Sequence, residues 1–117
     1  MELTDRDLFW LAGLFEGEGC ADWRKRDRTL RLRIQMTDRD IVERVARMWD
    51  TSLCGPYSWQ KKPQNLPVWT AAIQGKKAVL WALALLGLMG QRRKAKLTEL
   101  LLKLREKSSC VPSTVSS

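Results

Sequence analysis

The most regular alternation of apolar and polar residues lies between Thr29 and Met36. Its apolar positions are Leu30, Leu32, Ile34 and Met36, and its polar positions are Thr29, Arg31, Arg33 and Gln35. A period of two places these two sets on opposite faces of a β-strand. The sequence therefore predicts a strand at 29–36 that is buried on one face, paired with a strand at 20–26 through a turn at 27–28.

Helical spacing dominates the segments around this hairpin. Residues 4–18 begin with a capping-box pattern and repeat apolar residues at three- and four-residue intervals, and residues 38–50 do the same. Residues 76–89 are apolar on nearly all sides, so that helix should be covered by the sheet and its neighbours. A last helix should begin at Gln91 and bury Leu97, Leu100, Leu101 and Leu104.

Two further strands are predicted at 57–61 and 68–74, with residues 51–56 as a loop and Gly75 as a break. The alternation around Trp69 does not settle which face of this pair points inward. The resulting order is helix, two strands, helix, two strands, helix, helix. We expect one domain over residues 1–107, and a disordered polar tail over 108–117.

Composition narrows the chemistry of this 117-residue chain. Its formal net charge of +8 favours a polyanionic partner such as nucleic acid. The chain has no histidine, which excludes histidine-dependent nucleases, Ser-His-Asp hydrolases and histidine-ligated metal sites. Three widely spaced cysteines without a CxxC pair argue against a disulfide framework or zinc ribbon, so we expect an intracellular protein. No apolar run is long enough to span a membrane.

The polar face of the hairpin is rich in arginine. Carrying the period of two back through the turn puts Cys20, Asp22, Arg24 and Arg26 on the same face as Arg31, Arg33 and Gln35. A two-stranded ribbon fits the major groove of DNA, where arginine pairs with guanine and glutamine with adenine. An ordinary solvated sheet face is the alternative. Asp22 would repel phosphate there, although it could accept from a cytosine amino group. Lys61 and Lys62, at the tip of the other hairpin, are candidate phosphate contacts.

The C-terminal end of the first helix has two unusual features. Gly13 and Gly17 lie four residues apart, and each costs roughly 1 kcal/mol of helix propensity, which a close approach by another backbone would offset. Glu16 and Glu18 stand against the helix dipole, as groups held for a cation would. A solvated helix end beside a glycine cap is the alternative.

The whole string Leu11-Ala12-Gly13-Leu14-Phe15-Glu16-Gly17-Glu18-Gly19 resembles the signature of the LAGLIDADG homing endonuclease family. Phe15 stands for an aliphatic residue, and both motif acids are Glu instead of Asp. The resemblance implies an α+β, αββαββα half-domain with a four-stranded antiparallel DNA-binding sheet and helices on one face. Because the string occurs once, it also implies a homodimer acting on a pseudo-palindromic duplex. The interface would be formed by Leu11, Ala12, Gly13, Glu16 and Gly17.

The resemblance also implies a catalytic set. Glu18, with the backbone carbonyl of Gly17, would ligate Mg²⁺ or a similar divalent cation, and Asp38 would position the nucleophilic water. Arg92 is the preferred active-site cation, with Arg93 and Lys94 open as alternatives and expected on DNA. Glu16 is expected to be structural, near the dimer seam.

Three classes of function follow from these observations. The first is a site-specific, Mg²⁺-dependent endonuclease that makes a staggered double-strand break, as in intron or intein mobility. The second is a non-cleaving protein on the same scaffold, either an intron splicing cofactor or a regulator. The third is a small basic scaffold protein without nucleic acid, which would show no salt-dependent DNA affinity.

Overall fold

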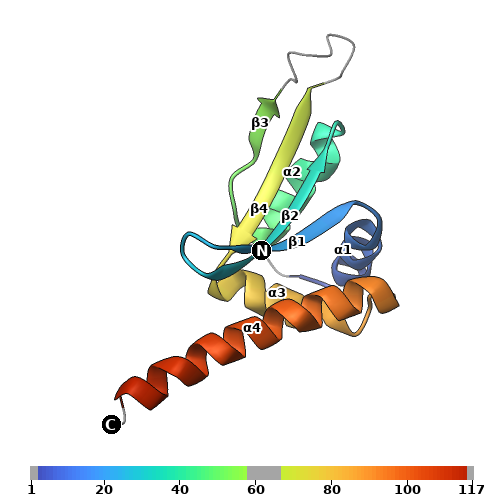
Figure 1. Ribbon diagram of the computed structural model, residues 1–117. Coiled ribbons are helices and arrows are strands. Elements are labelled where there is room, and N and C mark those ends of the chain that lie inside the picture. Colours follow the sequence, from blue (N-terminus) through green and yellow to red (C-terminus); the bar gives the residue numbers. More distant parts are fainter. Residues whose placement is uncertain (1–2, 58–66, 116–117) are drawn as a thin grey trace.

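Four helices and a four-stranded antiparallel sheet make up the described part of the chain, residues 3–57 and 67–115 of a computed structural model (Figure 1). The elements are α1 (Asp5–Glu18), β1 (Gly19–Arg24), β2 (Thr29–Met36), α2 (Arg39–Trp49), β3 (Cys54–Tyr57), β4 (Val68–Gln74), α3 (Lys76–Leu86) and α4 (Gln91–Val115). This order confirms the α+β, αββαββα architecture expected from the sequence. None of the helices in these residues has the length and apolarity needed to cross a membrane.

The strands are arranged in the order β1-β2-β4-β3, and each neighbouring pair is antiparallel. The hairpin of β1 and β2 pairs Gly19 with Ile34 and Asp22 with Arg31, and the predicted bounds of β2 and β4 are confirmed. In β4, Ala71 and Ile73 are buried. The sequence had left the facing of β4 open, and the register now places Thr70, Ala72 and Gln74 on the same face as the arginines of β2.

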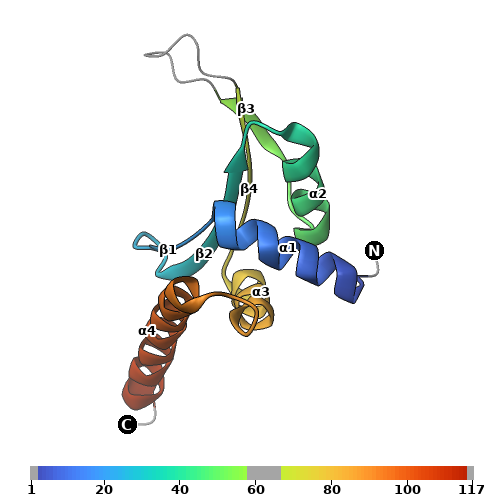
Figure 2. The ribbon, with the colours of Figure 1, turned by 90° about the vertical axis from the view of Figure 1, so that its right-hand side faces the viewer.

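All four helices cover the other face of the sheet. The core between them contains Leu30, Leu32 and Ile34 of β2, none of which exposes any surface. The helices contribute Leu11, Phe15, Val42, Val45, Trp49, Ala78, Leu85, Leu97 and Leu100. Figure 2 shows α2 beside β4 and α4 beneath the hairpin of β1 and β2. The arginine-bearing face is therefore left without a covering layer in the described part of the chain.

The third strand differs from the prediction. It begins at Cys54, whereas residues 51–56 were expected to form a loop and the strand to start at Tyr57. The loop was predicted because Gly55 and Pro56 are residues that normally weaken a strand. They are tolerated here because β3 lies at the edge of the sheet, where a proline need not donate to a second neighbour. The rest of the predicted strand, residues 58–61, lies outside the described residues.

The third helix is shorter and less covered than expected. It ends at Leu86 with Gly87 as its C-cap, and Leu80 and Leu83 remain 62% and 55% exposed. The prediction that the sheet and its neighbours cover this helix was therefore wrong for Leu80 and Leu83. The buried stripe is Ala78, Ala82 and Leu85, and Val79, Trp81 and Leu86 are partly buried against the core. The backbone of α4 is helical to Val115, through the segment predicted to be a disordered tail. The domain boundary at residue 107 stays a prediction.

Candidate functional site

Helix α1 delivers the motif acids to the junction with β1. Its start is fixed by a capping box, in which the Thr4 side chain accepts from the Asp7 backbone and the Asp7 carboxylate accepts from the Thr4 backbone N–H at 3.0 Å. Leu11 and Phe15 are fully buried, which fixes the rotation of the helix about its axis. A methyl group at Gly19 would collide with the Phe15 ring, so this glycine permits the close turn from helix into strand.

Glu16 is used within the chain. Its Oε1 accepts a hydrogen bond from the Gly90 N–H at 2.8 Å, and its backbone carbonyl accepts from Arg93 Nε at 3.2 Å. The Arg93 guanidinium also lies 5.8 Å from the centroid of the Phe15 ring. These contacts bind the end of α1 to the connection between α3 and α4. Glu16 and Arg93 therefore hold two parts of the fold together, and the place of Glu16 near a dimer seam stays a prediction.

Glu18 has a different environment. It is the exposed last residue of α1, and its side chain makes no hydrogen bond or ion pair with any described residue. Among the described side chains, those of residues 3–56 and 67–105, no group of three or more His, Cys, Asp or Glu could hold a metal ion. One chain thus offers a single exposed carboxylate here, next to the Gly17 carbonyl. Both are hard oxygen donors of the kind that Mg²⁺ prefers.

The exposed side of α1 is flat and apolar. Phe9 is 59% exposed, and Gly13 and Gly17 follow it at four-residue intervals on the same side of the helix. A methyl group at either glycine would meet no other atom within 4 Å. Leu11 and Ala12, by contrast, are only 0% and 5% exposed within the chain itself. Their expected place in a dimer interface, together with Gly13, Glu16 and Gly17, stays a prediction.

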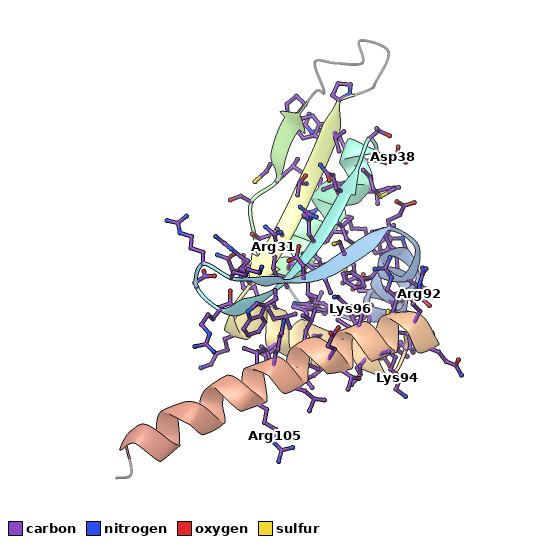
Figure 3. The ribbon with its side chains drawn as sticks, in the orientation of Figure 1. Arg31, Asp38, Arg92, Lys94, Lys96 and Arg105 are labelled. Atoms are coloured by element: carbon purple, nitrogen blue, oxygen red, sulfur yellow. The ribbon has the colours of Figure 1, made fainter. Side chains whose placement is uncertain are left out.

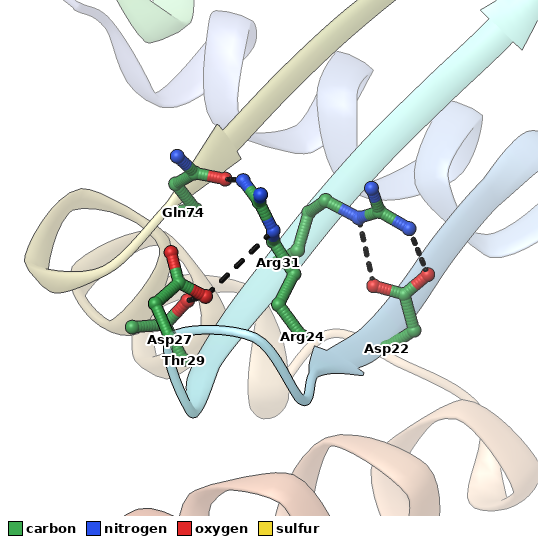
Figure 4. A network of polar contacts seen from close by, with 6 residues as sticks. All are labelled: Asp22, Arg24, Asp27, Thr29, Arg31 and Gln74. Carbon is green, nitrogen blue, oxygen red and sulfur yellow. Dashed lines mark hydrogen bonds and ion pairs between the residues drawn. The ribbon is translucent and has the colours of Figure 1, made fainter.

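Cross-strand pairs organise the open face of the sheet (Figure 4). Asp22 accepts two hydrogen bonds from Arg31, from Nε at 2.9 Å and from Nη2 at 2.7 Å. Arg24 Nη1 donates to Gln74 Oε1, and Arg33 Nη2 lies 3.7 Å from Cys20 Sγ. Gln35 is exposed on the same face. These six residues of β1 and β2 thus face the same way, as the alternation predicted, whereas Arg26 lies in the connecting turn.

The ion pair changes the acidity of Asp22. The pKa of the Asp22 carboxyl lies below its ordinary value of 3.8, mainly because Arg31 donates hydrogen bonds to the carboxylate. The charges of Arg31, Arg33 and Lys96 act in the same direction, and burial opposes them. The same hydrogen bonds raise the pKa of Arg31. Asp22 is therefore an anion at neutral pH within a positively charged surface.

The remaining predicted site residues are Asp38, Arg92, Lys94, Lys61 and Lys62. In Figure 3, Asp38 and Arg92 lie on either side of the junction of α1 and β1. Asp38 is the exposed N-cap of α2, and its side chain makes no capping hydrogen bond. Arg92 and Lys94 are exposed in the first turn of α4 and point in different directions, as residues two apart on a helix do. Lys61 and Lys62 lie outside the described residues.

Two residues of this surface were missed from the sequence. Gln74 belongs to this surface because it accepts a hydrogen bond from Arg24. Lys96 belongs to it because its positive charge acts on the Asp22 carboxylate. The alternation of β4 could have identified Gln74 had the inward face been known. Nothing in the local sequence of Lys96 indicates proximity to β1, because only the packing of α4 against the hairpin creates it.

Known proteins resemble this chain mainly in fold. The fold is similar to that in the crystal structure of a homing endonuclease, I-TnaI. The match covers 93% of this chain and 77% of that one, at 11% sequence identity and with a TM-score of 0.63. The chain also matches I-CvuI in complex with its target in the presence of 2 mM Ca, covering 94% of this chain and 73% of that one, at 14% identity with a TM-score of 0.64. Among curated proteins no match is found.

A sequence-family comparison is more specific than these structural likenesses. The family model described as "LAGLIDADG-like domain" matches residues 5–87, which span α1 through α3 and include the string at 11–19. The basic start of α4 lies beyond that match. Because the matched segment covers most of the chain and contains the motif itself, this protein belongs to the LAGLIDADG family.

Proposed function

We propose that this chain is a site-specific, Mg²⁺-dependent endonuclease that cuts double-stranded DNA as a homodimer and leaves a staggered break. The observation that supports it best is the separation of the two motif acids. Glu16 is bound to Gly90 and thereby fixes the end of α1, whereas Glu18 is exposed beside it without a partner among the described residues. An exposed carboxylate held in a fixed position suits a metal ligand better than a structural group.

DNA would lie on the open face of the sheet. Arg24, Arg31, Arg33 and Gln35 face it, and the chain carries a net charge of +8. Arginine and glutamine can read base edges in the major groove, while Arg26, Lys61 and Lys62 would contact phosphates. Arg92, Arg93 and Lys94 are the cations that would contact phosphate from the first turn of α4. Arg93 also donates from Nε to the Glu16 carbonyl and lies near the Phe15 ring, and these contacts would hold it at this edge.

Four groups would serve the hydrolysis itself. Glu18 and the Gly17 carbonyl, from each of two chains, would hold Mg²⁺, which when bound supplies charge neutralisation at the phosphate and a more acidic water. Asp38 would accept a hydrogen bond from the attacking water, because its carboxylate is exposed and is not used as a helix cap. Arg92 would stand beside the scissile phosphate and balance its charge.

Dimerisation would bring the two Glu18 side chains together. Phe9, Gly13 and Gly17 form one flat stripe, and the two glycines leave room for close approach of a second α1. A two-fold axis beside this stripe would place two copies of the junction near each other, each with one carboxylate. The target would then be a pseudo-palindromic duplex with one half-site for each sheet.

The test compares cleavage with binding. A randomised duplex library in a supercoiled plasmid is incubated with protein and Mg²⁺, and cut molecules are sequenced. The wild-type chain should yield a staggered cut at a selected site, and Glu18→Gln should abolish cutting while it retains affinity for that site. Glu43→Gln, which removes one negative charge from the exposed side of α2, is the matched control and should cut normally.

The non-cleaving alternative makes the opposite prediction. A splicing cofactor or regulator on this scaffold would bind nucleic acid with equal affinity in the wild-type and Glu18→Gln chains, and neither would cut. That result would refute the nuclease and leave the binding surface intact. If neither chain showed salt-dependent affinity for duplex DNA, both functions would be excluded.

A further inference from the structure

The Asp22–Arg31 pair differs from an ordinary surface salt bridge in its geometry. Both carboxylate oxygens accept from one edge of the guanidinium, at 2.9 Å to Nε and 2.7 Å to Nη2. The side chains are 33% and 31% exposed, so the pair is partly withdrawn from water. Because the two residues are direct cross-strand partners in β1 and β2, the backbone also fixes their separation. The pair therefore holds the long Arg31 side chain in one orientation.

This orientation leaves the other edge of the guanidinium free. Arginine has five N–H donors, and Asp22 takes the one on Nε and one of the two on Nη2. Both donors on Nη1 and the second donor on Nη2 have no partner among the described residues. They form a planar fork that matches two adjacent acceptors, and guanine presents such a pair, O6 and N7, in the major groove.

The neighbouring arginines are arranged differently. Arg24 uses Nη1, part of that terminal fork, on Gln74 Oε1. Among the described residues, Arg33 contacts the Cys20 thiol at 3.7 Å from Nη2, and sulfur is a weak acceptor that does little to fix the arginine side chain. Of the three, Arg31 thus combines a fixed side edge with a free terminal fork. An arginine whose rotamers are already restricted loses less entropy on binding, which favours specific recognition.

We propose that Asp22 is a positioning residue that fixes Arg31 to read one guanine in each half-site of the target. This inference rests on the proposed function, because it requires that the open face of the sheet meets a duplex. Asp22 itself would contact no base. Its negative charge is offset by the nearby positive charges of Arg33 and Lys96, which allows a carboxylate on a surface that approaches phosphates.

The experiment is a binding selection from randomised duplexes, with Ca²⁺ in place of Mg²⁺ so that binding is measured without cleavage. The wild-type chain should prefer guanine at one position of each half-site by on the order of 10-fold or more. Asp22→Asn should lose most of that preference and keep the other selected positions. It should also bind unrelated duplexes more tightly, because one negative charge has left the surface.

Two further variants make the result specific. Arg31→Ala should lose the guanine preference at the same position as Asp22→Asn. Glu43→Gln makes the same change of charge on α2, which covers the opposite face of the sheet, and should leave every preference unchanged. Circular dichroism of each variant verifies that the fold is retained.

Other outcomes would overturn the inference in distinguishable ways. If Asp22→Asn bound with an unchanged guanine preference, Asp22 would have no positioning role, although the proposed DNA-binding function would stand. A cytosine preference that Asp22→Asn loses and Arg31→Ala keeps would mean that Asp22 reads the base directly. A wild-type chain without duplex affinity would remove both the proposed function and this inference.

Discussion

Replacement of Gly13 by alanine should stabilise the folded chain and weaken its self-association. Gly13 is the ninth residue of the 14-residue helix α1, well inside its ends. Alanine is about 1 kcal/mol more favourable than glycine at such a position. A methyl group there would meet no atom within 4 Å, so no clash in the single chain offsets the gain. For a chain of this length, 1 kcal/mol corresponds to a rise of roughly 4 °C in Tm.

The same methyl group would stand in the proposed dimer seam. Two copies would place two added methyl groups where the helices approach most closely, and the axes would have to separate. The gain within each chain and the loss between chains therefore have opposite signs. This combination is not expected for a glycine that merely faces solvent.

The two effects can be measured separately. Urea unfolding at high dilution, where dimers dissociate, reports the stability of the single chain, and sedimentation equilibrium reports association. Gly87→Ala is the matched control, because a methyl group at Gly87 also meets nothing within 4 Å but lies at the end of α3. A Gly13→Ala chain that lost stability when monomeric, or that dimerised as tightly as wild type, would refute the reasoning.

Two further predictions concern the polar contacts. Gly90→Ala should lower the free energy of unfolding, measured in urea melts, by about 1–3 kcal/mol. The added methyl group would collide with Glu16 Oε1 and break its hydrogen bond from the Gly90 N–H. Unchanged stability would show that this hydrogen bond is not needed. Acid should weaken the fold partly through Asp22, whose pKa lies below 3.8 in the folded chain. Its stabilising contribution is present above pH 3.8 and is lost as the pH falls through the folded-state pKa. Unfolding free energies below pH 3.8 should therefore fall less steeply in Asp22→Asn than in wild type, and parallel slopes would contradict this.

Local patterns predicted those elements whose burial is one-sided. Strand β2 was identified with its bounds and buried face, and α1 with its cap, because alternation and capping are properties of neighbouring residues. Strand β3 was misplaced since its tolerance of Gly55 and Pro56 depends on being an edge strand. Helix α3 was expected to be enclosed because its sequence is apolar all round, yet composition does not say how many neighbours a helix has.

The candidate site divides in the same way. From helix propensity and the helix dipole, the sequence identified Glu16, Glu18 and the two glycines as unusual, and the alternation placed Asp22 beside the arginines. The motif does not show which of its residues face the chain's own core, as Leu11 and Ala12 do. Their burial became visible only once α1 was packed against the sheet.

By itself the sequence determined the order of the elements, the arginine-rich face of the hairpin and the family to which the chain belongs. Only the tertiary structure decided how the two motif acids are used, because the partner of Glu16 is Gly90, 74 residues further along the chain. It also decided that Arg31 is held by Asp22 while its terminal fork stays free. Spacing along a strand or helix specifies which face a residue occupies. The donors and acceptors that meet on that face depend on how distant segments pack, which no local pattern records.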